Sequence, residues 1–189
     1  MGLMIHNLEL LSEKATRDYF VYILDYGWDE PLSNVIRRNF DKLSNQASNS
    51  DSAIIIGVGE IGHFDNQVLS YHSINGENAE EILPAILITR TNPHVFKQYS
   101  DAQKRRIDEQ FKYVLIPLRK ICKTESDVVN LIHVLFRDIK DKKNLADFKV
   151  QKELKKGTGR AIVDSLILGP NFMGMGFDFN KFISYLKEK

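Results

Sequence analysis

Three glycines form the most recognisable chemical motif in this sequence. Gly57, Gly59 and Gly62 follow an apolar run at 53–58 (AIIIGV) in the spacing Gly-x-Gly-x-x-Gly. Glycines so spaced between a strand and a helix permit a tight turn and a close approach of backbone amides to a pyrophosphate. One hypothesis is therefore a nucleotide-binding loop, with Arg90 as the candidate for holding a 2′-phosphate. No acidic residue ends the next predicted strand to hold a ribose.

A second candidate lies in YILDYGWDEPL at 22–32, where an apolar strand runs directly into a helix start. Such junctions often hold catalytic or binding groups in α/β proteins, yet no nucleophile stands in this one. Asp29 suits a helix cap, and Pro31 is tolerated in the first turn. Trp28 and Glu30 complete the junction. These residue types predict binding rather than covalent catalysis.

Other reactive side chains are isolated. Cys122 is the single cysteine, which excludes an internal disulfide and a multi-cysteine metal site. The five histidines form no i, i+4 pair, although His63, Asp65 and His72 with Glu60 allow a metal site in an irregular loop. A basic turn at 155–160 (KKGTGR) combines freed backbone amides with the cations Lys155, Lys156 and Arg160. That turn predicts either a polyanion contact or a solvated linker.

Hydrophobic periodicity predicts the elements that position these residues. A strongly apolar strand covers Tyr19–Tyr26, and a helix opened by Asp29 and Pro31 buries one face through Leu43. Thr124 begins a capping-box helix that extends to Lys140. The remaining predictions are helices at 6–17 and 99–111, strands at 53–58, 84–89 and 112–118, and an irregular stretch at 61–82. A boundary near 143 divides an α/β domain (1–143) from a basic connector and C-terminal α+β extension (144–189).

The 189 residues carry a net charge of +1, but the two signs are segregated along the chain. Residues 1–95 hold 6 Lys and Arg against 13 Asp and Glu, whereas residues 96–189 hold 20 against 12. The basic half either contacts nucleic acid or another polyanion, or pairs with the acidic half, or the two halves simply solubilise separate faces of the protein. No apolar run reaches the ~20 residues that span a bilayer. We therefore expect a cytoplasmic protein without membrane contact, and the Lys-, Asn- and Ile-rich usage suggests a bacterial source.

The segment Trp28-Asp29-Glu30-Pro31-Leu32 resembles the W-C-G-P-C active-site string of the thioredoxin family. Trp and Pro match, and both cysteines are replaced. The segment Ile82-Leu83-Pro84-Ala85-Ile86-Leu87 resembles the family's cis-proline segment before the third core strand. The resemblance covers about residues 5–140, although an inserted helix at 92–111 departs from the family's tight hairpin.

This resemblance implies a three-layer thioredoxin-like sandwich with a central mixed sheet. It also implies that redox exchange is absent, because Asp29 replaces the attacking cysteine. What remains is a peptide-binding surface beside Pro84 and Trp28. We therefore expect a non-catalytic, cofactor-free interaction subunit of a multi-component assembly, with a protein partner and a basic tail. The alternative is a sensor or enzyme that binds a nucleotide at Gly57–Gly62, and a flavodoxin-like sheet would fit the β/α order equally.

Overall fold

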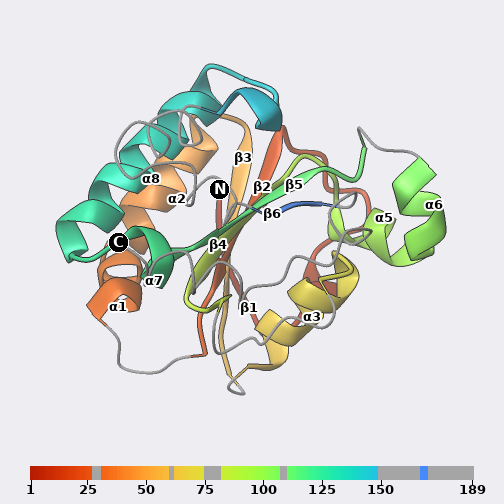
Figure 1. Ribbon diagram of the computed structural model, residues 1–189, viewed down its shortest axis with the longest axis horizontal. Helices are drawn as coiled ribbons and strands as arrows, with labels where there is room; N and C mark the ends of the chain where they lie inside the picture. The colour runs from red at the N-terminus through yellow and green to blue at the C-terminus, as the bar shows by residue number, and fades with distance from the viewer. Residues whose placement is uncertain (27–30, 60–61, 75–81, 107–109, 149–166, 170–189) are drawn as a thin grey trace, which may run out of the picture.

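A computed structural model describes residues 1–26, 31–59, 62–74, 82–106, 110–148 and 167–169. It has a mixed α/β architecture in which one twisted sheet is covered by helices on both faces (Figure 1). The strand order is β1-β3-β2-β4-β5-β6. The strands are β1 (Gly2–Ile5), β2 (Tyr19–Leu24), β3 (Ser52–Gly57), β4 (Ala85–Thr89), β5 (Tyr113–Pro117) and β6 (Ile167–Gly169).

Strand direction divides the sheet into two parts. Strands β1, β3 and β2 are mutually parallel, whereas β4 runs antiparallel to β2, β5 to β4 and β6 to β5. The register pairs Leu24 with Ala85, so the carboxyl end of β2 lies beside the start of β4. This edge also holds the end of β3, and it is called the loop edge below. The opposite edge, where β2 and β3 begin and β4 ends, is called the anchor edge.

The predicted central strand is confirmed as β2, which is buried along its whole length. Its side chains alternate between two cores: Tyr19, Val21 and Ile23 face one side, and Phe20, Tyr22 and Leu24 face the other. Continuous burial on both faces explains why this stretch is almost free of charge. The predicted strands at 53–58, 84–89 and 112–118 correspond to β3, β4 and β5.

Helices α1 (Pro31–Arg38), α2 (Phe40–Ser48), α7 (Leu118–Ile121) and α8 (Glu125–Lys140) lie over one face. The capping box predicted for α8 is confirmed. Thr124 Oγ1 accepts a hydrogen bond from the Asp127 amide, and the Asp127 carboxylate accepts one from the Thr124 amide. The apolar stripe predicted for residues 32–43 is also buried or half-buried. However, the stripe belongs to two helices, α1 and α2, which join at Asn39. The Asn39 side chain donates there to the Val35 carbonyl.

Helices α3 (His63–Tyr71) and α5 (Pro93–Gln98) cover the other face, and α6 (Asp101–Arg106) follows α5. The helix predicted at 99–111 is confirmed in part as α6, and residues 107–109 lie outside the described ranges. Helix α5 precedes it and was not predicted. The stretch 61–82 contains α3, a more regular element than expected. Two 3-10 turns, η1 (Leu8–Leu10) and η2 (Leu145–Asp147), complete the description.

The helix predicted at 6–17 is wrong: β1 precedes this segment, and η1 is its only helical turn. Several of its backbone groups bond side chains from other elements. The Leu8 amide donates to Gln67, the Leu11 carbonyl contacts His94 Nε2 at 2.7 Å, and Asn92 Nδ2 donates to the Ser12 and Ala15 carbonyls. Leu8 and Leu11 are nevertheless buried in the core.

Past the predicted boundary at 143, Leu145 and Phe148 lie in the same core as α8. Strand β6 extends the sheet beyond β5. Within the described ranges, no helix is long and apolar enough to cross a membrane.

Candidate functional site

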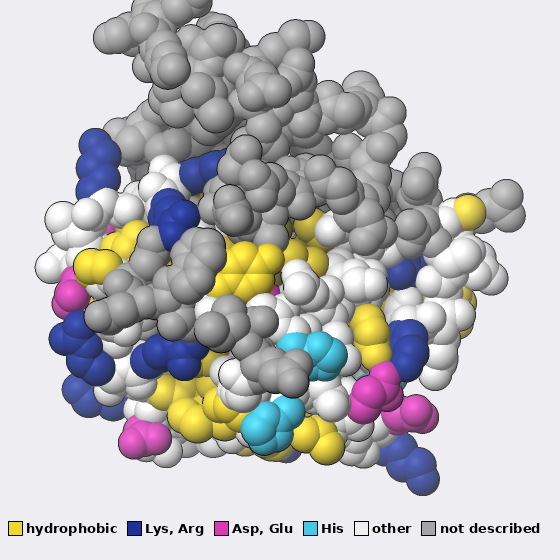
Figure 2. Space-filling view, turned by 90° about the horizontal axis from the view of Figure 1, so that it is seen from below, with side chains coloured by type: hydrophobic (Ala, Val, Ile, Leu, Met, Phe, Trp, Pro, Cys, Tyr) yellow, Lys and Arg dark blue, Asp and Glu magenta, His cyan; other side chains and the backbone are white. Residues whose placement is uncertain are grey.

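The loop edge gathers most of the residues that the sequence singles out. Pro31 opens α1 and is exposed, Pro84 precedes β4, Gly57 ends β3, and Gly59 and Gly62 follow it. Figure 2 looks onto this edge and shows histidine and apolar side chains side by side. Trp28, Asp29 and Glu30 lie outside the described residues.

Pro84 itself is buried, and the Leu83–Pro84 peptide bond is cis. Its carbonyl accepts the Leu118 amide at 2.8 Å, which ties the start of β4 to α7. Leu83 is only 3% exposed. The Pro84 carbonyl therefore already has an internal partner, so a bound peptide would have to use other groups of this edge.

The sequence analysis missed a cluster of charged side chains at the end of β2. The Asp25 amide donates to Asp65 Oδ1 at 2.7 Å, and Arg37 Nε donates to Asp25 Oδ2 at 2.9 Å. These bonds connect β2 to α3 on one side of the sheet and to α1 on the other. An aspartate directly after an apolar strand was the available signal, because strand ends at such an edge often carry functional groups.

Asp65 is 3% exposed, an uncommon environment for a carboxyl group. Burial raises the pKa of Asp65 to about 6, and the negative charge of Asp25 acts in the same direction. The Asp25 amide and the Arg37 charge oppose this rise only in part. Asp65 can therefore exchange a proton near neutral pH, unlike an exposed aspartate.

The Gly-x-Gly-x-x-Gly segment lies where predicted, but side chains of this protein surround its glycines. A Cβ on Gly57 would lie 2.6 Å from Phe64 Cβ, one on Gly59 2.5 Å from His6 Nδ1, and one on Gly62 2.6 Å from Tyr26 Cε1. Gly59 and Gly62 also have positive φ angles of 98° and 75°. Turn geometry and internal packing thus account for all three glycines without a ligand.

Arg90 lies at the anchor edge, immediately after β4. Its guanidinium stands over the Tyr19 ring, with 5.6 Å to the ring centroid, and donates to Asn144 Oδ1 at 3.2 Å. Because β4 is antiparallel to β2 and β3, the length of the sheet separates Arg90 from the glycines. The structure does not bring these predicted nucleotide contacts together.

Cys122 is buried, and burial raises the pKa of its thiol to about 12. The thiol is therefore protonated throughout the physiological range and is a poor nucleophile. Cys122 is therefore a core residue.

The histidine cluster that the sequence allows is not assembled among the described residues, and Glu60 lies outside them. His63 is exposed, whereas His72 is buried, with Nδ1 2.7 Å from the Val68 carbonyl and its ring packed on Phe96. Asp65 bonds the Asp25 amide instead. No group of three or more metal-ligating side chains occurs in the described part of the chain.

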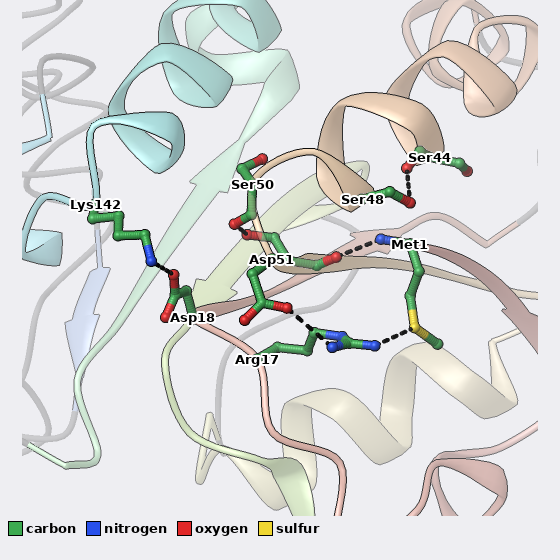
Figure 3. Close-up of polar contacts among 9 residues, drawn as sticks. Met1, Arg17, Asp18, Ser44, Ser48, Ser50, Asp51 and Lys142 are labelled. Carbon is green, nitrogen blue, oxygen red and sulfur yellow. Dashed lines mark hydrogen bonds and ion pairs between the residues drawn. The ribbon is translucent and has the colours of Figure 1, made fainter.

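The predicted polyanion residues Lys155, Lys156 and Arg160 lie outside the described ranges. At the anchor edge, near where the connector begins, Lys142 pairs with Asp18 at 2.8 Å and Arg17 with Asp51 at 3.0 Å (Figure 3). The Arg17 guanidinium also contacts Met1 Sδ. The Asp18–Lys142 pair joins the acidic and basic halves of the chain, in agreement with the pairing alternative.

The chain matches no protein-family model, no curated protein and no solved structure.

Proposed function

We propose that this protein is a redox-inactive, thioredoxin-like interaction subunit of a multi-component cytosolic assembly, and that it binds a protein partner at the loop edge. The segment from Trp28 to Pro31 provides the contact surface on the α1 side. Pro84 marks the adjoining start of β4.

The order of elements supports the thioredoxin-like part of this proposal. Strand β2, helices α1 and α2, the parallel strand β3 and helix α3 are followed by the antiparallel strand β4, helices α5 and α6, the antiparallel strand β5, α7 and the long amphipathic α8. Helices α5 and α6 stand where the family has a tight hairpin. Pro84 directly precedes the first antiparallel strand, as the resemblance implies. The two matching prolines thus fall at the same edge of the sheet.

The burial of Cys122 is the main observation that supports the absence of redox activity. Disulfide exchange needs a thiolate with access to its substrate, and a dithiol enzyme needs a second cysteine. This sequence contains one cysteine, and it is buried in the core beneath α8. Thiol chemistry at the loop edge therefore has no nucleophile.

An insulin-reduction assay tests this part directly. Purified protein should give the same rate as buffer with dithiothreitol, and a Cys122→Ser variant should match the wild type. Turnover that disappears in the variant would contradict the proposal.

The binding surface is tested by affinity capture from the native host with wild type, Trp28→Ala and His133→Ala. His133 is exposed on the outer side of α8, away from the loop edge, and serves as the matched control. A partner retained by wild type and His133→Ala but lost by Trp28→Ala supports the proposal. The same partners on all three baits would refute the assigned surface.

We further propose that Lys155, Lys156 and Arg160 contact a polyanion. Replacing all three with glutamate should abolish salt-sensitive binding to heparin or duplex DNA. Replacing the three exposed lysines Lys14, Lys42 and Lys140 with glutamate gives a control with the same change in charge. Binding that survives the triple substitution would rule out this role for the tail.

A further inference from the structure

Asp65 occupies a position at which its proton can govern contact between two elements. It lies in the first turn of α3, and among the described residues its hydrogen-bond partner outside that helix is the amide of Asp25, at the end of β2. The Asp25 carboxylate is in turn held by Arg37 of α1. One carboxyl group therefore connects α3 to a chain that also includes β2 and α1.

The surroundings favour the neutral form of Asp65 for reasons of geometry. The group is almost fully removed from water, and the negative charge of Asp25 raises the pKa of Asp65 further. The Asp25 side chain is 5% exposed and is paired with Arg37. An ionised Asp65 would thus be a second buried negative charge, which is costly without a dedicated cation.

Other charged groups near α3 are engaged elsewhere. Strand β3 has no titratable side chain between Ser52 and Gly57. Glu9 of η1 and Lys97 of α5 pair with each other and with Tyr71, at the far end of α3. His94 of α5 contacts the Leu11 carbonyl, and His63 is exposed. Within the described residues, Asp25 and Arg37 are therefore the charged groups that face Asp65.

We propose that Asp65 is a proton-operated latch: in its neutral form it holds the first turn of α3 against the end of β2, and on ionisation that turn opens to hydrate the carboxylate. This inference is independent of the proposed function. It places a pH-dependent movement at the loop edge, next to the glycine turn at Gly62 that begins α3.

The direction of the pH dependence follows from the proton affinities of Asp65 in the closed and open states. The closed state binds the Asp65 proton more tightly, with a pKa of about 6 against an ordinary 3.8. Closure is therefore favoured at low pH and weakened as the pH rises through 6. Full hydration on opening would change the opening equilibrium by up to ~100-fold between pH 4 and pH 7.5.

Hydrogen exchange of the full chain tests the latch. After correction for intrinsic exchange rates, the amides of residues 63–71 should lose protection in the wild type as the pH rises from 5 to 7.5. Asp65→Asn keeps an oxygen acceptor for the Asp25 amide but cannot ionise, so its protection should not change. Asp41→Asn, which alters an exposed carboxyl in the first turn of α2, should behave as wild type.

Equal loss of protection in wild type and Asp65→Asn would overturn the proposal. If Asp65→Asn does not fold, an NMR titration of the wild type decides instead. The amide proton of Asp25 donates to Asp65 and should shift with a midpoint near pH 6. A midpoint near pH 4 would show that Asp65 ionises without constraint and that no latch exists.

Discussion

Gly57 lies so close to Phe64 that the space of its missing side chain is already filled. A Cβ at Gly57 would approach Phe64 Cβ to 2.6 Å and its ring to 2.7 Å. Phe64 is 2% exposed and packs against β2, so the ring has little room to withdraw. The first glycine of the motif is thus needed for contact between β3 and α3.

A Gly57→Ala substitution should therefore destabilise the protein by ~1–3 kcal/mol, as overpacking of a filled core does. Urea unfolding would measure the change. Phe64→Ala provides the matched test, because it removes the ring atoms that a new Cβ would approach to 2.7 and 2.8 Å, although the Cβ of residue 64 remains. The double variant should lose less stability than the sum of the two single changes, whereas strict additivity would argue against this contact.

Nucleotides should leave the melting temperature unchanged, since the glycines pack internally and Arg90 lies at the other edge. A thermal-shift panel of mono- and dinucleotides with wild type and Arg90→Ala checks this expectation. A rise in melting temperature that Arg90→Ala removes would restore the nucleotide hypothesis.

Loss of the cap on α8 should be measurable. Thr124→Ala removes the oxygen that accepts the Asp127 amide, and such caps contribute about 1 kcal/mol. Ser126→Ala, on the exposed side of the same turn, provides the control and should change the unfolding free energy much less. Equal effects of the two substitutions would mean that hydroxyl loss, rather than the cap, is responsible.

His72 should make the protein sensitive to acid. Burial lowers the pKa of His72 to about 4, whereas an unfolded histidine titrates near 6.5. The unfolded state therefore binds the proton first, and stability is lost as the pH falls from 6.5 to 4, by about 3 kcal/mol at most. His72→Phe should remove this loss, while His133→Phe should keep it.

Asp65 works in the opposite direction over an overlapping range of pH. Its raised pKa favours the folded state at low pH, so the wild-type curve combines two opposed slopes. The His72 contribution is therefore read from the difference between wild type and His72→Phe at each pH. A difference that does not vary between pH 4 and 6.5 would contradict the assigned pKa.

Cys122 should resist labelling in the native state. With a pKa of about 12, its thiolate fraction at pH 8 is on the order of 10³-fold below that of a free cysteine. Reaction with a disulfide reagent should be correspondingly slow until urea is added. Fast labelling of the native protein would show that the thiol is accessible.

The elements that were predicted best are those whose burial or capping produces a recognisable pattern of neighbouring residues in the sequence. Continuous apolar runs identified β2 and β3, and the Thr124–Asp127 pair identified the start of α8. The segment at 6–17 failed because its carbonyls bond Asn92 and His94, more than 75 residues away, which no local pattern reveals. The conformation of residues 6–17 therefore depends on hydrogen bonds to residues that are distant in the sequence.

At the candidate site, too, local sequence patterns were predicted correctly and contacts between distant residues were not. The spacing of Gly57, Gly59 and Gly62 predicted a turn after a strand, and the structure has one. The side chains that pack against this turn could not be predicted, because His6 and Tyr26 come from other parts of the chain. Asp65 was missed as a titrating group because only the fold buries it and places Asp25 beside it.

Tyr19 joins three parts of the anchor edge. Its hydroxyl donates to the Lys143 carbonyl, Arg90 covers its ring, and Phe148 packs against it with 5.7 Å between ring centroids. The chain is thereby fastened at the start of β2 before it continues past Phe148. A force on the chain at Phe148 would reach the middle of the sheet through this tyrosine, and a partner on the loop edge would be at the opposite end of the same strand.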